Sequence, residues 1–377
     1  MTATQESRAH AAQEQSKSFR RSTIGRFLRP ALSLAIAVLV PLVAVGHLGG
    51  LKEGWLLGLS LSELNFALIT LLAALALHVL IGRTGLISIG SAGFYALGAG
   101  VGGLIGVQLE MPFEVVLIVS GVVGALIGAI VGLPSLKLKG LYALLATLAF
   151  HFIAIYAFLE YESAQFDTTG IMYPEASFLG MRLANDEAWY FFLIVIALMT
   201  FLGARNLAKD RQGRALLAVR DQELAAKLSG VSVGATKVKV YALTSSVTTV
   251  AGTLYVYYQS TATVELFTFD LAIHLIAIIV IGGLTSASGA IVGVAIWTML
   301  PKLIENIFDQ AGAGSSGVAL SWITDNLDGL TNAVFGLAIV MIMVLRPAGL
   351  IGLGRILADS IPDLRSKTLR GGVHNGE

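Results

Sequence analysis

The sequence predicts an all-α fold, a polytopic bundle of about ten membrane segments with both chain ends in the cytoplasm. Of the 377 residues, 55% are hydrophobic and only 13% are charged, whereas soluble domains carry about 25% charged residues. Apolar runs of about 20 residues recur, which is the length an α-helix needs to cross the hydrocarbon core. The alternating pattern of outer-membrane barrel strands does not occur, so the chain is predicted to be an integral, multi-pass helical protein.

The apolar segments divide the chain into two tails and one membrane domain. Residues 1–29 and 347–377 are predicted cytoplasmic tails, and residues 30–346 form the membrane domain, with a long cytoplasmic loop at 205–239. The first segment lacks a small-residue cleavage site after a short core, so it is not a cleaved signal peptide. We place the segments, some of them short or broken, at residues 30–49, 62–82, 85–107, 114–134, 140–159, 189–204, 240–259, 271–283, 286–304 and 329–346.

The basic residues set the predicted orientation. With the N-terminus inside, alternation of the segments places 22 of the 25 Lys and Arg residues in the cytoplasm. The three exceptions are Lys52, Arg182 and Lys302. Since cytoplasmic loops carry an excess of Lys and Arg, this division supports the assignment.

The stretch 271–304 admits two interpretations. One long tilted helix would send the basic C-terminal tail outside, against the charge rule. Two short segments that meet at "GGLTSASG" (282–289) restore the sign. We therefore predict a helical pair that does not fully span the membrane.

Two glycine-rich stretches, "GLISIGSAG" (85–93) and "GLTSASGA" (283–290), resemble each other and hint at an internal duplication. Each lies at the predicted cytoplasmic turn between two apolar segments. Small residues allow helices to pack closely in lipid, and broken helices also build the sites of transporters. The first interpretation is tight packing, and the second is a translocation path lined by Ser88, Ser91, Ser286 and Ser288.

Three histidines, His78, His151 and His274, lie within apolar segments, where ionisable groups are functional candidates. They could make structural hydrogen bonds or line the same path. A metal site is disfavoured because no second ligand stands at metal spacing, and the chain has no cysteine. No local arrangement of Ser, His and Asp suggests hydrolysis, so we assign no catalytic, cofactor-binding or metal-binding residue.

The cytoplasmic loop contains a predicted amphipathic helix at 213–229. Leu217, Leu224, Ala225 and Leu228 fall on one face, and Gly230 suits the position after the helix end. The apolar face could rest on the lipid surface, on the underside of the protein itself, or in a groove of a cytoplasmic partner.

This loop carries a family resemblance. Its "GRALLAVRDQELAAKLSGVSV" resembles the coupling segment of ABC-importer permeases, and most closely that of the branched-chain amino acid permease family. Four further stretches are similar to that family in order: "GRTGLISIGSAGFYALGA", "LKGLYALLATLAF", "IVIGGLTSASGAIVGVAIWTMLPKLI" and "VLRPAGLIGL". The resemblance implies ATPase-coupling roles for Arg214, Leu217, Arg220, Glu223, Leu224, Ala225, Ala226, Leu228 and Gly230.

The resemblance also implies partners. These are a second, homologous permease subunit in a heterodimer, two ABC ATPase subunits that bind ATP and Mg²⁺, and an extracytoplasmic solute-binding protein. The expected location is the bacterial inner membrane, among lipids and without nucleic acid. This chain has no Gly-x-x-x-x-Gly-Lys-Ser/Thr motif and is expected to hydrolyse nothing.

Two departures from the family pattern concern the solute. Many members have His where this chain has Ser91, and a longer Thr-Gly-Gly pattern where it has "DTTGIMY" (167–173). The solute therefore stays open among branched-chain amino acids, urea, short amides and small organic acids. Two other classes of function are alternatives to the ABC permease: a secondary transporter coupled to protons through a histidine, and a membrane-embedded enzyme.

Overall fold

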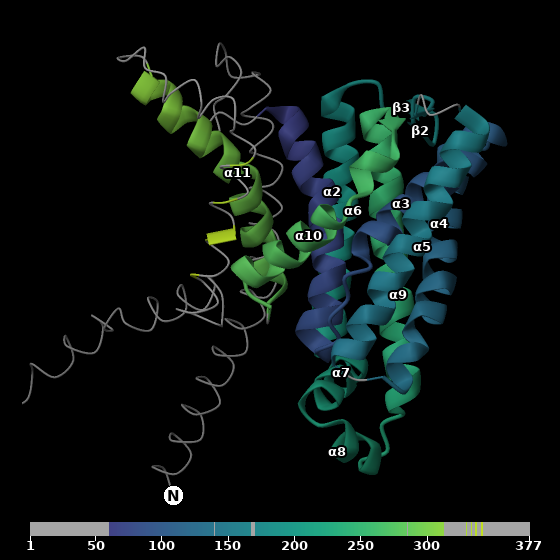
Figure 1. The fold of residues 1–377 in the computed structure, drawn as a ribbon, viewed down its shortest axis with the longest axis vertical. Helices are drawn as coiled ribbons and strands as arrows, with labels where there is room; N and C mark the ends of the chain where they lie inside the picture. The colour runs from purple at the N-terminus through teal and green to yellow at the C-terminus, as the bar shows by residue number, and fades with distance from the viewer. Residues whose placement is uncertain are drawn as a thin grey trace, which may run out of the picture. The chain divides into compact units, whose positions relative to one another are not determined.

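The chain folds as a helical bundle (Figure 1). The structure, a computed structural model, describes residues 60–312 except 139, 167–169 and 285, with backbone alone for 304–312, and five isolated residues between 329 and 341. The predicted tails, the segment 30–49 and nearly all of 329–346 lie outside the described residues. The principal helices are α2 (Leu61–Leu77) with the π-helix η1 (His78–Gly82), α3 (Ser91–Val101) with the π-helix η2 (Gly102–Gln108), α4 (Phe113–Gly132), α5 (Leu141–Phe166), α6 (Asp186–Lys209), α9 (Val233–Gln259), α10 (Phe269–Gly282) and α11 (Ala287–Gly312).

The eight predicted segments between 62 and 304 are each helical, with one correction. The predicted segment 85–107 begins with a non-helical stretch at 85–90, and its helix starts only at Ser91. Gly85 has φ +69°, a left-handed conformation that favours glycine and ends the preceding helix. The local reason for the break is therefore in the sequence, although the run is apolar enough to continue as a helix.

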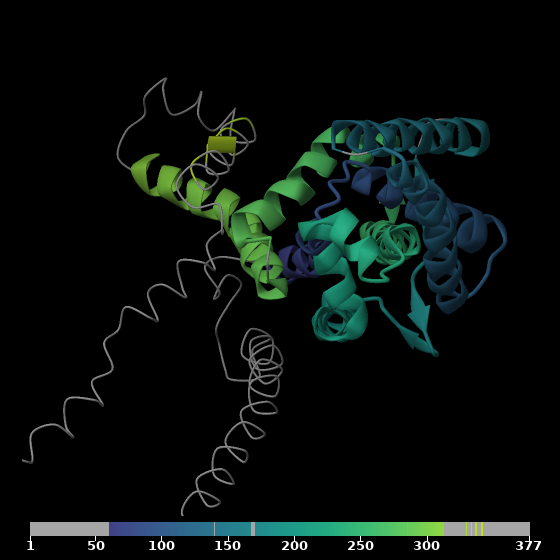
Figure 2. The ribbon, with the colours of Figure 1, turned by 90° about the horizontal axis from the view of Figure 1, so that it is seen from below.

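The central helix is α9, which packs against α2, α3 and α4 (Figure 2). Small residues on α4 recur every fourth position and face it: Ser120, Gly124, Gly128 and Gly132. A Cβ on Gly124 or Gly128 would overlap Thr249 or Ser245 of α9. In lipid, such small residues let two helix backbones approach closely, which fixes the α4–α9 interface.

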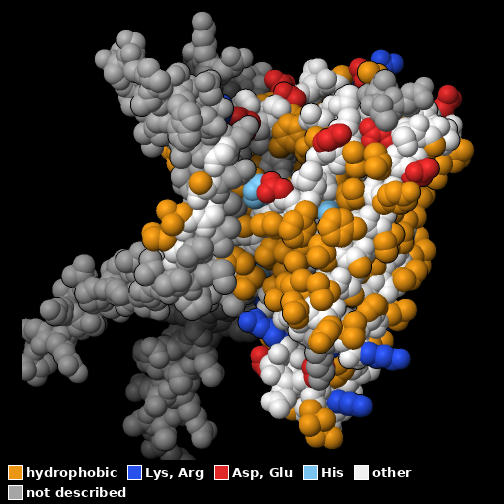
Figure 3. Space-filling model, viewed as in Figure 1, with side chains coloured by type: hydrophobic (Ala, Val, Ile, Leu, Met, Phe, Trp, Pro, Cys, Tyr) orange, Lys and Arg blue, Asp and Glu red, His pale blue; other side chains and the backbone are white. Residues whose placement is uncertain are grey.

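The opposite face of α4 carries large apolar side chains, again four residues apart: Ile118, Val122, Leu126 and Ile130. They are exposed in the described structure, as expected for a surface turned to lipid. Figure 3 shows an apolar band over the middle of the bundle, with basic side chains gathered below it and most acidic ones above it. This distribution agrees with the predicted orientation, which stays a prediction.

Within the part of the chain that the structure describes, five helical stretches are long and apolar enough to cross a membrane: 61–82, 113–136, 141–166, 186–209 and 264–282. The apolar part of α11, Ala287–Leu303, is shorter. The chain is thus a helical membrane protein, while the count of about ten segments stays a prediction. Helix α9 falls outside these five because it carries several Thr and Ser residues, and its position inside the bundle makes an apolar surface unnecessary.

Helices α10 and α11 form a helical pair, as predicted, and not one long helix, although the stretch 264–282 that contains α10 is long and apolar enough to cross a membrane. The chain turns at 283–286, where Gly283 has φ +117°. A Cβ on Gly282, Gly289 or Gly293 would overlap backbone atoms across the pair, so glycine is required for this contact. The pair packs against α2 through both of its helices.

The end of the bundle opposite helices α7 (Arg211–Asp221) and α8 (Glu223–Leu228) carries short strands, a small departure from the all-α prediction (Figure 1). Strand β1 (Ile171–Met172) pairs with β4 (Thr261–Ala262), and β2 (Ser177–Phe178) pairs with β3 (Met181–Arg182). Next to β1, the Tyr173 hydroxyl donates a hydrogen bond to the Ala99 carbonyl over 2.9 Å. Burial raises the pKa of Tyr173, so this hydroxyl keeps its proton and ties the loop to α3.

Candidate coupling and translocation sites

The cytoplasmic loop forms two helices, α7 (Arg211–Asp221) and α8 (Glu223–Leu228), where the sequence predicted one at 213–229. The break is at Gln222, whose φ of −159° and ψ of 105° are extended. Gly230 ends α8 with φ +83°, as its predicted position after the helix requires. The two helices lie at the lower end of the bundle in Figure 1.

The inner face of α7 differs from the predicted one. Leu216 and Val219 are buried, whereas the predicted Leu217 is only half-buried. Leu216 packs with Val79 and Leu80 of η1. The periodicity predicted an amphipathic helix but not which of its faces contacts the bundle. That face is set by the bundle itself, against which Leu216 and Val219 are buried.

The α8 face, in contrast, is turned outward. The Leu224 side chain is 66% exposed and Leu228 is 81% exposed, and Ala225 beside them is also exposed. Of the predicted coupling residues in α8, Ala226 is the one that is buried. Two exposed leucines one helical turn apart form an apolar patch that no described residue covers.

A buried ion pair holds α8 in place. Lys237 of α9 is 2% exposed, and its Nζ lies 2.5 Å from Glu223 Oε1 at the start of α8. The same Nζ donates a hydrogen bond to the Ser135 carbonyl over 3.2 Å, at the end of α4. Glu223, one of the coupling residues that the family resemblance implies, thus has an ion-pair partner within this chain. Sequence reasoning missed Lys237, although a lysine at the edge of an apolar run was a signal.

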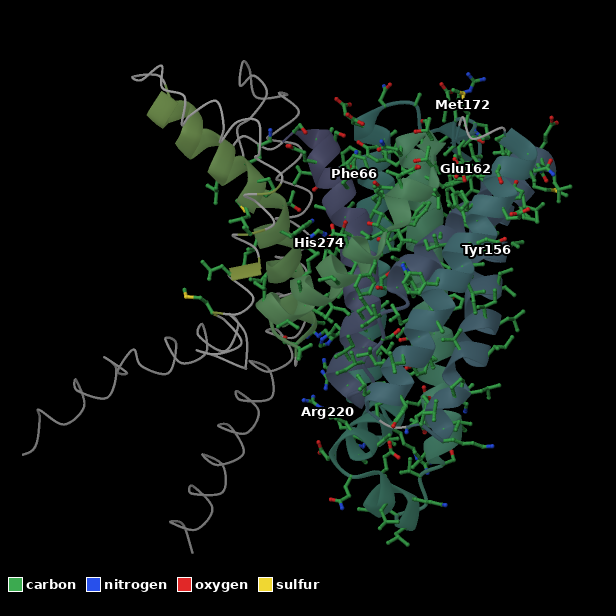
Figure 4. All side chains as sticks on the ribbon, in the orientation of Figure 1. Phe66, Tyr156, Glu162, Met172, Arg220 and His274 are labelled. Atoms are coloured by element: carbon green, nitrogen blue, oxygen red, sulfur yellow. The ribbon has the colours of Figure 1, made fainter. Side chains whose placement is uncertain are left out.

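Two arginines of α7 have different surroundings. Arg220 donates from Nη1 to the Gly82 carbonyl over 2.6 Å, reaching from α7 to the end of η1 (Figure 4). Arg214 is exposed and donates to the Lys209 carbonyl over 3.2 Å, a bond local to the loop. Arg220 is therefore, like Glu223, a predicted coupling residue that contacts the bundle.

The first glycine-rich stretch is enclosed. Ser88 and Ser91 are buried, and the Gly90 backbone N–H donates to Ser88 Oγ over 3.3 Å. The Ile89 N–H donates to Thr147 Oγ1 of α5 over 3.1 Å. Thr147 was not predicted, and only the fold brings it to this stretch.

The second glycine-rich stretch is more open. Ser286 and Ser288 share a hydrogen bond of 2.6 Å, and Ser288 is exposed. Its neighbour Leu284 lies against η1, where a Cβ on Gly82 would overlap the Leu284 carbonyl oxygen. The structure thus brings the turn 283–286 to the helix end that precedes the first stretch, while the four serines do not form one cluster.

The three histidines lie apart. His78 is buried in η1, and its Nδ1 lies beside Gly82, at the approach of the turn 283–286. His151 is buried in α5, with its ring 6.1 Å from that of Phe269. His274 Nδ1 lies 3.2 Å from Asp270 Oδ2, and its ring lies 4.3 Å from Trp297. Among the described residues no group of His, Asp and Glu is placed to hold a metal ion.

Comparison with known proteins supports the family that the sequence motifs resemble. The family described as "Branched-chain amino acid transport system / permease component" matches residues 60–345. The chain is 24% identical to the high-affinity branched-chain amino acid transport system permease protein LivM of Escherichia coli (strain K12), over 83% of this chain and 72% of that protein.

Two further relatives are similar. The LivM permease of Salmonella typhimurium is 24% identical over 77% of this chain and 69% of its own length. The probable LivM permease of Methanocaldococcus jannaschii is 25% identical over 62% of this chain and 67% of its own length. No solved structure matches the chain. Its family match and its membrane-competent helices together show that the chain belongs to the permease family of branched-chain amino acid ABC transporters, as a multi-pass inner-membrane transport component.

Proposed function

We propose that this chain is one permease subunit of an ATP-driven importer that takes up branched-chain amino acids or a related small solute. It pairs with a second, homologous permease subunit as a heterodimer. Two ABC ATPase subunits bind the ATP and Mg²⁺, and an extracytoplasmic binding protein delivers the solute. The relatives are permeases of branched-chain amino acid transport systems, which favours branched-chain amino acids as the solute class.

The observation that carries this proposal is the pair of outward leucines on an anchored segment. Lys237 and Leu216 hold α8 and α7 to the bundle from inside, so Leu224 and Leu228 face away from it. A segment that is anchored to the bundle on one side and apolar on the other can insert its apolar side into a groove of a cytoplasmic partner. Movement of that partner would then reach the membrane helices through a rigid contact.

The test is the double change Leu224→Asp and Leu228→Asp. Truncating a buried interface anchor often costs about 1–2 kcal/mol, so the pair should weaken ATPase assembly at least about tenfold. Solute-stimulated ATP hydrolysis and uptake should fall with it, measured in proteoliposomes with all partners present. The bundle should stay folded because both side chains lie outside it.

A matched control separates charge from lost apolar surface. Gln212→Asp with Ser229→Asp adds the same two negative charges to exposed positions of the same segment. This control should assemble and transport normally. Normal ATPase copurification and transport in the Leu224→Asp, Leu228→Asp variant would remove the coupling role.

The proton-coupled secondary transporter is less well supported, since family membership favours an ATP-driven permease. Uptake by proteoliposomes without ATPase subunits would reverse this preference. The solute itself is best found through the cognate binding protein. A ligand at 100 times its Kd adds about 2.7 kcal/mol to the stability of that protein, which a thermal shift screen detects.

A further inference from the structure

We propose that Arg220 and the π-helix His78–Gly82 form a mechanical link that passes movement of α7 to the turn between α10 and α11. The inference rests on the proposed coupling function and adds a route inside the membrane domain. Its two contacts join segments that are far apart in the sequence.

The first contact joins α7 to η1. Arg220 Nη1 lies 2.6 Å from the Gly82 carbonyl oxygen, and a hydrogen bond from a guanidinium is stronger than one between neutral groups. The carbonyl is free to accept because the last C=O groups of a helix lack intrahelical partners. Beside this bond, Leu216 packs with Val79 and Leu80, so α7 and η1 are held together by polar and apolar contacts.

The second contact joins η1 to the turn 283–286. Gly82 approaches the Leu284 carbonyl so closely that a Cβ would overlap it. The His78 imidazole, one turn earlier in η1, lies beside the same contact, because a Cβ on Gly82 would come within 3.0 Å of His78 Nδ1. Gly82 therefore contacts both the coupling segment and the α10–α11 turn.

The π-helix is suited to change between two arrangements. Helices with i→i+5 bonds are rare, and single π turns inside α-helices are frequent at functional sites. Conversion of η1 to α-helix would rotate the following residues by about 100°, one residue step of an α-helix. A discrete element of this kind, biased by contacts at both ends, is what coupling between distant sites requires.

A double-mutant cycle tests whether the two contacts act in series. Arg220→Gln removes the first contact, and His78→Leu replaces the imidazole that lies beside the second. Each should lower the number of solute molecules taken up per ATP hydrolysed about fivefold or more, the low end of coupling between sites. Since links in series fail together, the double variant should be no worse than either single one. The assay uses the complete transporter with its ATPases and binding protein in proteoliposomes.

Conservative variants and a control complete the design. His78→Gln keeps a polar side chain and should retain more coupling than His78→Leu, and Arg220→Lys should retain more than Arg220→Gln. Arg211→Gln removes an exposed arginine from the same helix and should leave the ratio unchanged. Uptake per ATP is independent of how much complex assembles, so a purely structural role would not lower it.

The outcomes distinguish two failures. An unchanged ratio in Arg220→Gln, or losses that multiply in the double variant, would overturn the link and leave the proposed function standing. A wild-type complex that takes up solute without ATP hydrolysis would overturn the proposed function and the link with it.

Discussion

The two glycine-rich stretches have similar composition and each connects two helices, yet their surroundings in the bundle differ. The first, 85–93, is closed by a distant helix: Thr147 of α5 accepts the Ile89 N–H over 3.1 Å, and Ser88 and Ser91 are buried. The second, 283–290, forms a compact local turn in which Ser286 and Ser288 bond to each other. Small residues therefore permit close approach, but they do not determine which helix packs against them.

The close approaches also differ in range. In the α10–α11 pair, Gly282, Gly289 and the turn backbone meet within one hairpin. At the first stretch, Gly90 and Gly93 pack against α5. The glycines of the second stretch therefore meet backbone nearby in sequence, whereas those of the first meet a helix far along the chain.

The largest expected effect breaks the second stretch. Gly289→Ala places a Cβ against the Gly283 carbonyl oxygen, and backbone on both sides of the turn cannot yield. Overpacking of this kind costs about 1–3 kcal/mol or more, so uptake should be lost. Gly90→Ala should have a smaller effect on uptake, since its Cβ would lie 3.0 Å from the Thr147 carbonyl oxygen and 3.2 Å from the Phe150 ring.

The two alanine variants are compared by their unfolding midpoint in SDS and by uptake. Leucine at either position should abolish uptake. Equal tolerance of alanine and leucine at both glycines would show that neither turn makes the tight contacts described here.

A smaller effect is expected from Thr147→Val, which removes the acceptor for the Ile89 N–H. A buried N–H left without a partner costs about 1–3 kcal/mol. The unfolding midpoint in SDS should fall accordingly, while Ser288→Ala, at the exposed site of the second stretch, should change it little. Similar midpoints for the two variants would remove the contrast between a closed and an open stretch.

Cysteine labelling sharpens the same contrast without a large change in stability. The chain has no cysteine, so single substitutions need no background changes. Ser288→Cys should react with a membrane-impermeant thiol reagent added from the cytoplasmic side, and Ser88→Cys should be protected. Equal reaction rates would mean that the first stretch opens as freely as the second.

The last prediction perturbs the protein least and tests the orientation of the helical pair. If α10 and α11 enter and leave from the same side, a cysteine at Asn326 should be labelled from outside. A cysteine at Ser366 should be labelled only from the cytoplasm. The reverse pattern would contradict the paired arrangement of 271–304 within the membrane.

The coupling segment shows how far sequence reasoning extends. Its helical character, its Gly230 stop and the exposed Leu224 and Leu228 agree with the predicted periodicity. The break at Gln222 and the burial of Leu216 in place of Leu217 were not predicted. Helical periodicity is local, whereas the choice of the buried stripe depends on Val79 and Leu80, which lie far away in the chain.

The sequence by itself determined the membrane environment, the helical class, the positions of eight segments and the family. These follow from hydropathy, charge and motifs, which are properties of neighbouring residues. Only the tertiary structure decided that Lys237 pairs with Glu223, that Thr147 closes the first glycine-rich stretch, and that Arg220 reaches Gly82. Each of these contacts satisfies a charge or a backbone group, and the packing of the helices, not the local sequence, determines which partner is within reach.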